Sequence, residues 1–131
     1  MRLIIAGGRD FNSLDLLTER MDFLLKETTE QVVIISGTAA GADRVGEQYA
    51  ADKGYLVERY PAQWDKFGKS AGYKRNQQMA DQADAVVVFW NGKSYGSKHM
   101  IDIAKKMGLN LRIVRYTNHK GQIFLDLEER S

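Results

Sequence analysis

The chain has 131 residues, of which 44% are apolar and 27% charged, with a net charge of +2 and no cysteine. This length suits one domain with a core of its own, and the lack of cysteine excludes disulfides, thiolate metal sites and a cysteine nucleophile. The small charge does not require a polyanionic polymer as partner. The first apolar run, residues 3–6, is too short to cross a bilayer, so we expect a cytoplasmic protein with no membrane partner.

Five apolar, β-rich runs alternate with helical patterns along the chain. The runs cover residues 3–6, 32–35, 55–60, 85–89 and 111–116, and the helical patterns fall at about 14–25, 45–53, 70–82 and 97–107. The first, second and fourth runs are continuously apolar, which is typical of strands covered on both faces of a parallel sheet. The alternation predicts an α/β fold with a doubly wound, mostly parallel sheet and helices on both faces.

Residues 116–121 contain turn signals, and residues 122–127 have the pattern of a last strand. We therefore predict a single domain over residues 1–131, with a short C-terminal strand extension at about 117–131.

Glycine and polar residues follow three of the predicted strands directly. The clusters are Gly7-Gly8-Arg9-Asp10, Ser36-Gly37-Thr38-Ala39-Ala40-Gly41-Ala42-Asp43-Arg44 and Trp90-Asn91-Gly92-Lys93-Ser94-Tyr95-Gly96-Ser97. Doubly wound folds bind their ligands outside the carboxyl ends of the strands. The sequence therefore predicts a ligand site at this edge of the sheet.

The cluster at residues 36–44 has the features of an anion site. Gly37 and Gly41 lack a Cβ and let the backbone approach a ligand closely, and the helix that follows offers free N–H groups and a positive dipole end. The alternative is that these glycines only make a tight turn, and that Asp43 only complements the helix dipole. The spacing matches neither GxGxxG nor a Walker loop, so a generic nucleotide fingerprint is absent.

Further candidates have two readings each. Arg9 is either a phosphate fork or a solvated surface residue. The segment 69–76 is dense in Lys and Arg. Its Arg75 is predicted in the first turns of a helix, where a cation is unfavourable unless an anion is near; the alternative is a charged, solvated face. Trp90 either stacks on a base or has a core or lid role, and His99 stands alone, as structural histidines usually do. The sequence contains no recognisable metal site or Ser/His/Asp triad, and we expect neither a metal nor a cofactor.

Three motifs in their strand–helix context resemble one known family. They are Ser36-Gly37-Thr38-Ala39-Ala40-Gly41-Ala42-Asp43, Lys74-Arg75-Asn76-Gln77-Gln78-Met79, and Ser94-x-Gly96-x-x-His99-x-Ile101-x-x-Ala104. Together they resemble the YspA/YpsA-related branch of the SLOG superfamily, over about residues 3–116. SLOG domains are Rossmann-like, and the superfamily includes the LOG cytokinin-activating phosphoribohydrolases, the DNA-processing protein DprA and predicted sensors of nucleotide-derived signals.

The resemblance implies a nucleotide-based ligand with its phosphate at the 37–43 turn. It also implies that Arg75 and Asn76 point into the same cleft, and that the Ser94-to-His99 motif contributes at the end of the fourth strand. The turn departs from the LOG signature Pro-Gly-Gly-x-Gly-Thr-x-x-Glu, because it lacks the Gly-Gly pair and the glutamate, and Glu47 lies one turn further on. It looks more like the Ser-Gly-x-Ala-x-Gly-Ile-Asp turn of DprA, which binds single-stranded DNA.

These observations give one leading hypothesis and two alternatives. The first is that the chain binds a nucleotide or a nucleotide-derived small molecule, as a sensor or sequestering module. The alternatives are a nucleotide N-glycosidase of LOG type, and single-stranded DNA binding of DprA type, which the low net charge does not favour. We also expect a homo-oligomer, a dimer or higher.

The candidate residues are summarised by role. The candidate catalytic carboxylates are Asp43 and Glu47. The candidate ligand- and phosphate-binding residues are Gly7, Gly8, Arg9, Ser36, Gly37, Thr38, Ala39, Gly41, Ala42, Asp43, Arg75, Asn76, Trp90, Ser94, Gly96, Ser97 and His99.

Overall fold

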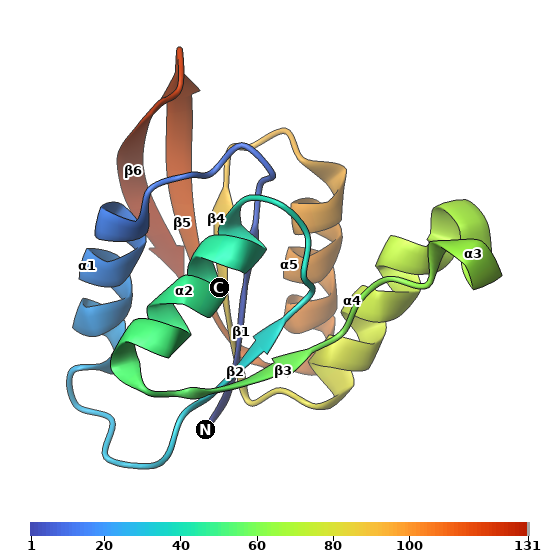
Figure 1. Ribbon diagram of the computed structural model, residues 1–131, viewed down its shortest axis with the longest axis horizontal. Helices are drawn as coiled ribbons and strands as arrows, with labels where there is room; N and C mark the ends of the chain where they lie inside the picture. Colours follow the sequence, from blue (N-terminus) through green and yellow to red (C-terminus); the bar gives the residue numbers. More distant parts are fainter. Residues whose placement is uncertain (131) are drawn as a thin grey trace.

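A computed structural model describes residues 1–130, with side chains up to residue 126, so Ser131, the end of the predicted extension, lies outside the described residues. The elements in chain order are β1 (Arg2–Gly7), α1 (Leu14–Leu25), β2 (Val33–Ser36), α2 (Ala42–Lys53), β3 (Leu56–Arg59), α3 (Trp64–Phe67), the 3-10 helix η1 (Gly68–Ser70), α4 (Ala71–Asp81), β4 (Ala85–Trp90), α5 (Tyr95–Met107), β5 (Asn110–His119) and β6 (Gln122–Arg130). Figure 1 shows their arrangement.

The six strands form one sheet in the order β3-β2-β1-β4-β5-β6. Neighbouring strands from β3 to β5 are parallel, and β6 pairs antiparallel with β5. At the centre, Ile4 of β1 lies opposite Ile35 of β2 and Val86 of β4. The prediction of a mostly parallel, Rossmann-like α/β fold is confirmed.

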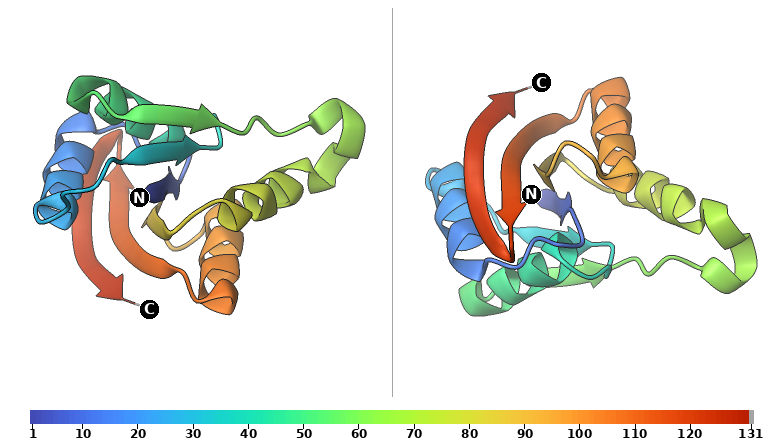
Figure 2. Two further views of the ribbon diagram at one scale, coloured as in Figure 1. Left: turned by 90° about the horizontal axis from the view of Figure 1, so that it is seen from below. Right: turned by 90° about the horizontal axis from the view of Figure 1, so that it is seen from above.

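Alternate residues of β1 point to opposite faces of the sheet, as the two-residue period of a strand requires. Leu3 and Ile5 belong to the core cluster that includes Leu17 of α1 and Tyr49 of α2. Ile4 and Ala6 belong to a second cluster that includes Met79 of α4, and Met100 and Ile101 of α5. The sheet therefore separates two cores, with α1 and α2 over one face and α4 and α5 over the other (Figures 1 and 2).

The helix boundaries follow local signals in the sequence. Helices α2 and α5 end directly before Gly54 and Gly108, as predicted. Helix α5 begins two residues earlier than the pattern of apolar residues indicates, because Ser94 caps its first turn. Strand β5 extends beyond the predicted end at residue 116, because its pairing with β6 continues as far as His119 and Gln122.

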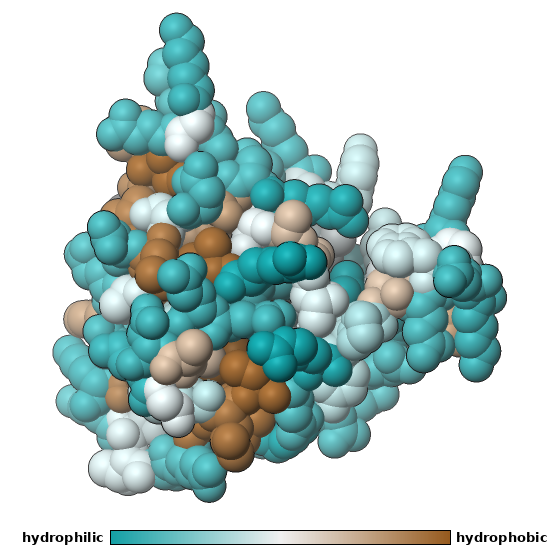
Figure 3. Space-filling model, viewed as in Figure 1, coloured by the Kyte–Doolittle hydropathy of each residue, from teal (hydrophilic) through white to brown (hydrophobic). Residues whose placement is uncertain are grey.

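One segment that the sequence did not predict is the arm that precedes α4. Here α3 and η1 follow one another directly and lead into α4, and no residue of either short helix is buried. Figure 2 shows that α3 stands away from the sheet at the end of this arm. In Figure 3 the arm carries mostly hydrophilic residues, whereas strongly hydrophobic residues gather near α1, α2 and strands β2 and β3.

The sheet order places the chain reversal between β1 and β4. Strand β1 leads into α1 on one face, and β4 leads into α5 on the other, so the loops after the two strands diverge and leave a crevice at their carboxyl ends. Within the described residues, no helix combines the length and the apolar character needed to cross a bilayer.

Candidate functional site

A cavity of about 500 Å³ opens at this crevice. It has four walls: the loop after β1, the end of the β2–α2 loop with the first turn of α2, the β4–α5 loop with the first turn of α5, and the arm from α3 to α4. The lining residues are Ala6, Gly7, Arg9, Asp10, Ala39, Asp43, Trp64, Lys69, Gly72, Tyr73, Arg75, Asn76, Asn91, Ser94, Gly96 and Ser97.

The first turn of α5 presents hydroxyl groups and a helix N-terminus to the cavity. The Oγ of Ser94 accepts hydrogen bonds from the backbone N of Ser97 at 3.3 Å and from the Oγ of Ser97 at 3.1 Å. No acidic residue lies in this turn, and a Cβ added to Gly96 would meet no atom within 4 Å. The positive end of the helix dipole is therefore open to an anionic ligand.

The Ser94 cap can be separated from the ligand site by substitution. Ser94→Ala is expected to lower the free energy of unfolding by about 1 kcal/mol, because it removes the side-chain acceptor at the helix start. Ser94→Asp keeps an acceptor and is expected to keep the stability, yet to weaken binding of any phosphate by charge repulsion. Urea unfolding and ligand titration of both variants test this expectation. Equal phosphate affinity of Ser94→Asp and the wild type would contradict it.

Arg75 and Asn76 join two walls of the cavity. The Nη1 of Arg75 donates to the carbonyl oxygen of Gly37 in the β2–α2 loop, and its Nε donates to the Oδ1 of Asn76 at 3.1 Å. The Nδ2 of Asn76 donates to the carbonyl oxygen of Gly96 at 3.3 Å and lies 3.2 Å from the Nδ1 of His99. This chain of contacts holds the β2–α2 turn and the first turn of α5 in a fixed relation.

Asp43 is a buried carboxylate on the cavity wall, with 6% of its surface exposed. Burial raises its pKa to about 6, although a hydrogen bond from the backbone N of Ala39, at 3.1 Å, and the nearby Arg75 lower it. A Cβ on Gly37 would lie 2.8 Å from both Arg75 Nη1 and Asp43 Oδ2. Gly37 therefore lets the guanidinium and the carboxylate approach the same point of the turn.

The other candidate carboxylate, Glu47, supports the turn from behind. Its Oε2 accepts from the Oγ of Ser36 at 2.6 Å, and its Oε1 accepts from the Nε of Arg59 at 2.9 Å. The same Oγ of Ser36 accepts from the backbone N of Thr38 at 3.1 Å, a residue with the positive φ of 65°. Of the two candidate catalytic carboxylates, Asp43 lines the cavity and Glu47 does not.

Part of the turn predicted to bind phosphate is instead used for contacts within the protein. The backbone N of Ala42 donates to the carbonyl oxygen of Gly8 at 3.1 Å, and a Cβ on Gly41 would lie 2.3 Å from that same oxygen. A Cβ on Gly8 would lie 2.0 Å from the hydroxyl of Tyr116. Gly41 therefore allows the β1–α1 and β2–α2 loops to pack closely, and Gly8 allows the β1–α1 loop to pack against β5.

Trp90 and His99 stand behind the cavity wall. The Nε1 of Trp90 donates to the carbonyl oxygen of Ser94 at 3.2 Å, and the guanidinium of Arg115 lies 4.9 Å from its ring centroid. The His99 ring lies 4.3 Å from the ring of Tyr73, centroid to centroid. Burial lowers the pKa of His99, and Asp102 opposes that shift. Both residues support cavity residues rather than line the cavity.

Sequence reasoning missed the aromatic part of the site. Trp64 and Tyr73 line the cavity and remain 50% and 47% exposed, respectively. Lys69 adds a third cation to Arg9 and Arg75. The basic segment 69–76, which contains Lys69 and Tyr73, indicated part of this wall in the sequence. Trp64 lies outside that segment and reaches the cavity only through the path of the arm from α3 to α4.

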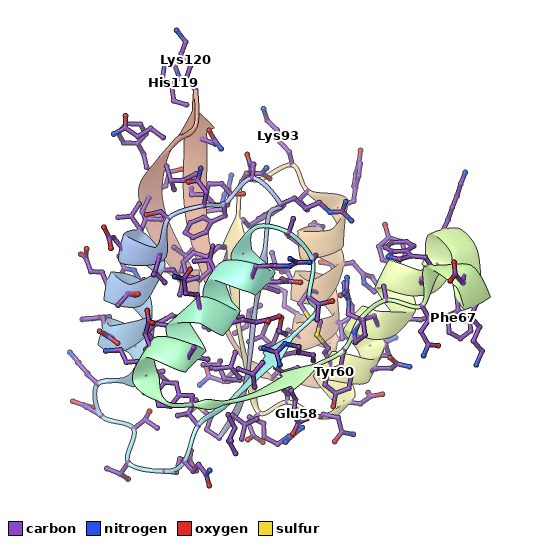
Figure 4. The ribbon with its side chains drawn as sticks, viewed as in Figure 1. Glu58, Tyr60, Phe67, Lys93, His119 and Lys120 are labelled. Carbon is purple, nitrogen blue, oxygen red and sulfur yellow. The ribbon has the colours of Figure 1, made fainter. Side chains whose placement is uncertain are left out.

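Other charged residues lie away from the cavity. Figure 4 shows Lys93 projecting from the β4–α5 loop, and His119 and Lys120 at the tip of the β5–β6 hairpin. Directly after β3, the hydroxyl of Tyr60 donates to the Oε1 of Glu58 at 3.1 Å. The ring of Phe67 belongs to α3 (Figure 4). In the part of the chain with described side chains, no three His, Asp or Glu residues are grouped to hold a metal ion.

Comparisons with known proteins agree on the kind of fold. The model of the family described as "YspA, cpYpsA-related SLOG family" matches residues 1–67, slightly more than half of the chain. The X-ray structure of DNA processing protein A (DprA) from Streptococcus pneumoniae superimposes with a TM-score of 0.68, at 17% sequence identity over 92% of this chain. The match covers 52% of that DprA chain, so this chain spans about half of its length. At this identity the likeness shows the fold alone, and the search of curated proteins gave no match.

Proposed function

Because the chain belongs to the YspA, cpYpsA-related SLOG family, we propose that it binds a nucleotide or a nucleotide-derived signal, as a sensor or sequestering module. The observation that carries this proposal is the make-up of the cavity of about 500 Å³ at the β1–β4 crevice. Its volume of about 500 Å³ is that of a small-molecule site. Its walls combine cations, a helix N-terminus, carboxylates and exposed aromatic rings.

The phosphate is best placed at the first turn of α5. Ser94, Gly96 and Ser97 offer hydroxyls and the positive helix end, and Arg75 and Lys69 line the same cavity. The 37–43 turn is less suitable on the cavity side, because the Asp43 carboxylate there would repel a phosphate. We therefore propose that the phosphate lies at the first turn of α5 and not at the 37–43 turn that the sequence favoured.

The remaining walls suit a sugar and a base. Carboxylates accept hydrogen bonds, so Asp43 and Asp10 suit the hydroxyl donors of a ribose. Trp64 and Tyr73 present rings on which a base can stack. The three chemical parts of a nucleotide therefore each have a complementary group in the cavity.

Calorimetric titration tests the proposal. We expect at least one nucleoside 5′-monophosphate, among those of adenosine, guanosine, cytidine and uridine, to bind about tenfold more tightly than its unphosphorylated nucleoside. Lys105→Ala, at the opposite end of α5, serves as a control and should leave both affinities unchanged. If neither these monophosphates nor nucleotide-derived signalling molecules such as cyclic dinucleotides bind, the proposal fails.

Asp43 supports a second candidate function, hydrolysis of a nucleoside monophosphate at its glycosidic bond. A carboxylate in a water-poor site stabilises the cationic sugar that forms as the C1′–N bond breaks; water then adds to C1′, and the departing base takes up a proton. The buried position of Asp43 on the cavity wall and its raised pKa favour this candidate. Free base released from a nucleoside monophosphate, and lost in Asp43→Asn, would support hydrolysis. No free base after long incubation at high protein concentration would exclude it for the nucleotides tried.

A further inference from the structure

A second cavity of about 270 Å³ adjoins the first, because the two share the lining residues Arg9, Ala39, Trp64 and Arg75. Its other walls are the 37–40 turn, Arg44 of α2, and Pro61 and Ala62 of the segment before the arm. The nucleotide site proposed above uses Arg75 and Trp64 from the shared wall and none of these other walls.

The charge of the second cavity is of one sign. Among the residues with described side chains, its lining includes three arginines, Arg9, Arg44 and Arg75, and no acidic residue, whereas Asp10 and Asp43 line the first cavity. Guanidinium groups stay charged at all ordinary pH values and repel one another at short range. The Asp43 carboxylate attracts Arg75 and Arg9 from the wall of the first cavity, and an anion in the second cavity would relieve the repulsion that remains.

Two of these guanidinium groups are held in place on successive residues of the turn. The Nε of Arg44 donates to the carbonyl oxygen of Thr38 at 3.3 Å, and the Nη1 of Arg75 donates to the carbonyl oxygen of Gly37. A guanidinium has five N–H donors, so each retains donors for a ligand. Fixed forks of this kind suit the oxygens of a phosphate.

Thr38 adds an independent observation. It is a β-branched residue with φ of 65°, a conformation that such residues rarely adopt. The hydrogen bond that its backbone N donates to the Oγ of Ser36, at 3.1 Å, stabilises this conformation. Thr38 also lines the second cavity. Backbone strain at a polar residue is characteristic of ligand sites.

We propose that the second cavity is an anion subsite that binds a second phosphate of the ligand, separate from the phosphate at α5. This inference rests on the proposed function. The subsite is smaller than the roughly 300–1,000 Å³ of small-molecule sites, so it takes a phosphate group rather than a second nucleoside. The ligand class is therefore a nucleotide with two separate phosphate groups, of which a nucleoside 3′,5′-bisphosphate is the simplest.

The test compares the 3′,5′-bisphosphate and the 5′-monophosphate of the same nucleoside, for each of the four ribonucleosides, by calorimetric titration. The bisphosphate of the preferred nucleoside is expected to bind about tenfold more tightly than its monophosphate, since charge-assisted hydrogen bonds are the strong ones. Arg44→Ala should abolish that gain. Lys105→Ala, an exposed cation in the last turn of α5, should preserve the gain.

The outcomes separate this inference from the proposed function. If a monophosphate binds and its bisphosphate binds no more tightly, the second subsite is wrong and the nucleotide site stands. If Arg44→Ala weakens both ligands equally, the separate subsite is also wrong. If no monophosphate or bisphosphate binds, the second subsite is wrong, and the proposed function is then decided by the titration of nucleotide-derived signalling molecules described above. If affinity for 5′-phosphorylated single-stranded oligonucleotides instead rises steadily with their length, a nucleic acid replaces the small ligand.

Discussion

Replacing Asp43 with asparagine is expected to raise the free energy of unfolding by about 2–3 kcal/mol near neutral pH. The pKa of the Asp43 carboxyl is about 6 in the folded protein, against a reference value of 3.8, and each unit of difference corresponds to about 1.4 kcal/mol. Asparagine carries no charge to bury, and its Oδ1 can still accept the hydrogen bond from Ala39. The substitution therefore removes a cost without removing the contact.

The effect has a defined dependence on pH. Because the pKa of Asp43 is raised in the folded state, the folded protein holds more protons than the unfolded chain between about pH 4 and pH 6, and its stability falls as the pH rises through that window. The stabilising effect of Asp43→Asn should be small below about pH 4 and complete near pH 7. Urea unfolding at both ends of the window measures it.

Asp52→Asn is the matched control, since Asp52 is an exposed carboxylate on the same helix. It should change the stability by less than about 0.5 kcal/mol. A loss of stability in Asp43→Asn at neutral pH but not at low pH would show that the charged carboxylate contributes net stability, contrary to this expectation. Such a cost to stability is the trade-off expected of a residue that serves the ligand-binding or catalytic role proposed for Asp43.

Replacing Arg75 with methionine is expected to lower nucleotide affinity about 100-fold. Arg75 lines both cavities, and it links the Gly37 carbonyl to Asn76 and so to the first turn of α5. Its removal is expected to take away a donor to the proposed phosphate and to loosen two walls at once. It also removes the positive charge that lowers the pKa of Asp43, so that pKa should rise further.

The neighbouring Lys74 supplies the matched control for Arg75→Met. Its ammonium lies 4.9 Å from the centroid of the Phe67 ring, and Lys74 does not line the main cavity. Lys74→Met removes the same charge and should leave the affinity within about twofold of the wild type. Arg75→Lys should recover only part of the affinity, because an ammonium lacks the paired donors of a guanidinium. Equal affinities of Arg75→Met and Lys74→Met would refute the assigned role.

The sequence predicted the fold well where a short local signal decides the structure. The continuously apolar runs of β1, β2 and β4 mark strands covered on both faces, and Gly54 and Gly108 mark the ends of α2 and α5. The helix α3 was not predicted, because four residues are too few to display a helical period and its start has no side-chain cap.

The sequence predicted the part of the candidate site that local signals place, and it missed the part that depends on contacts distant in sequence. Arg9, Asp43, Arg75 and Asn76 line the cavity because they follow strands or begin helices, positions that can be read from the sequence. Trp64 reaches the cavity through the path of the arm, which involves contacts distant in sequence. Trp90 is an aromatic residue of the kind that can stack on a base. Its indole N–H, however, donates to the Ser94 carbonyl oxygen, and the Arg115 guanidinium lies over its ring.

The arm forms one wall of the cavity in which we propose that a ligand binds. Neither α3 nor η1 buries a side chain, so detaching this segment from the body exposes little apolar surface and has a small free-energy cost. The wall that carries Trp64 and Lys69 can therefore open by a local fluctuation while both cores of the sheet stay intact. Exchange of the proposed ligand is then expected to depend on a cooperative unit much smaller than the domain, so that its rate can change through the arm without any change in global stability.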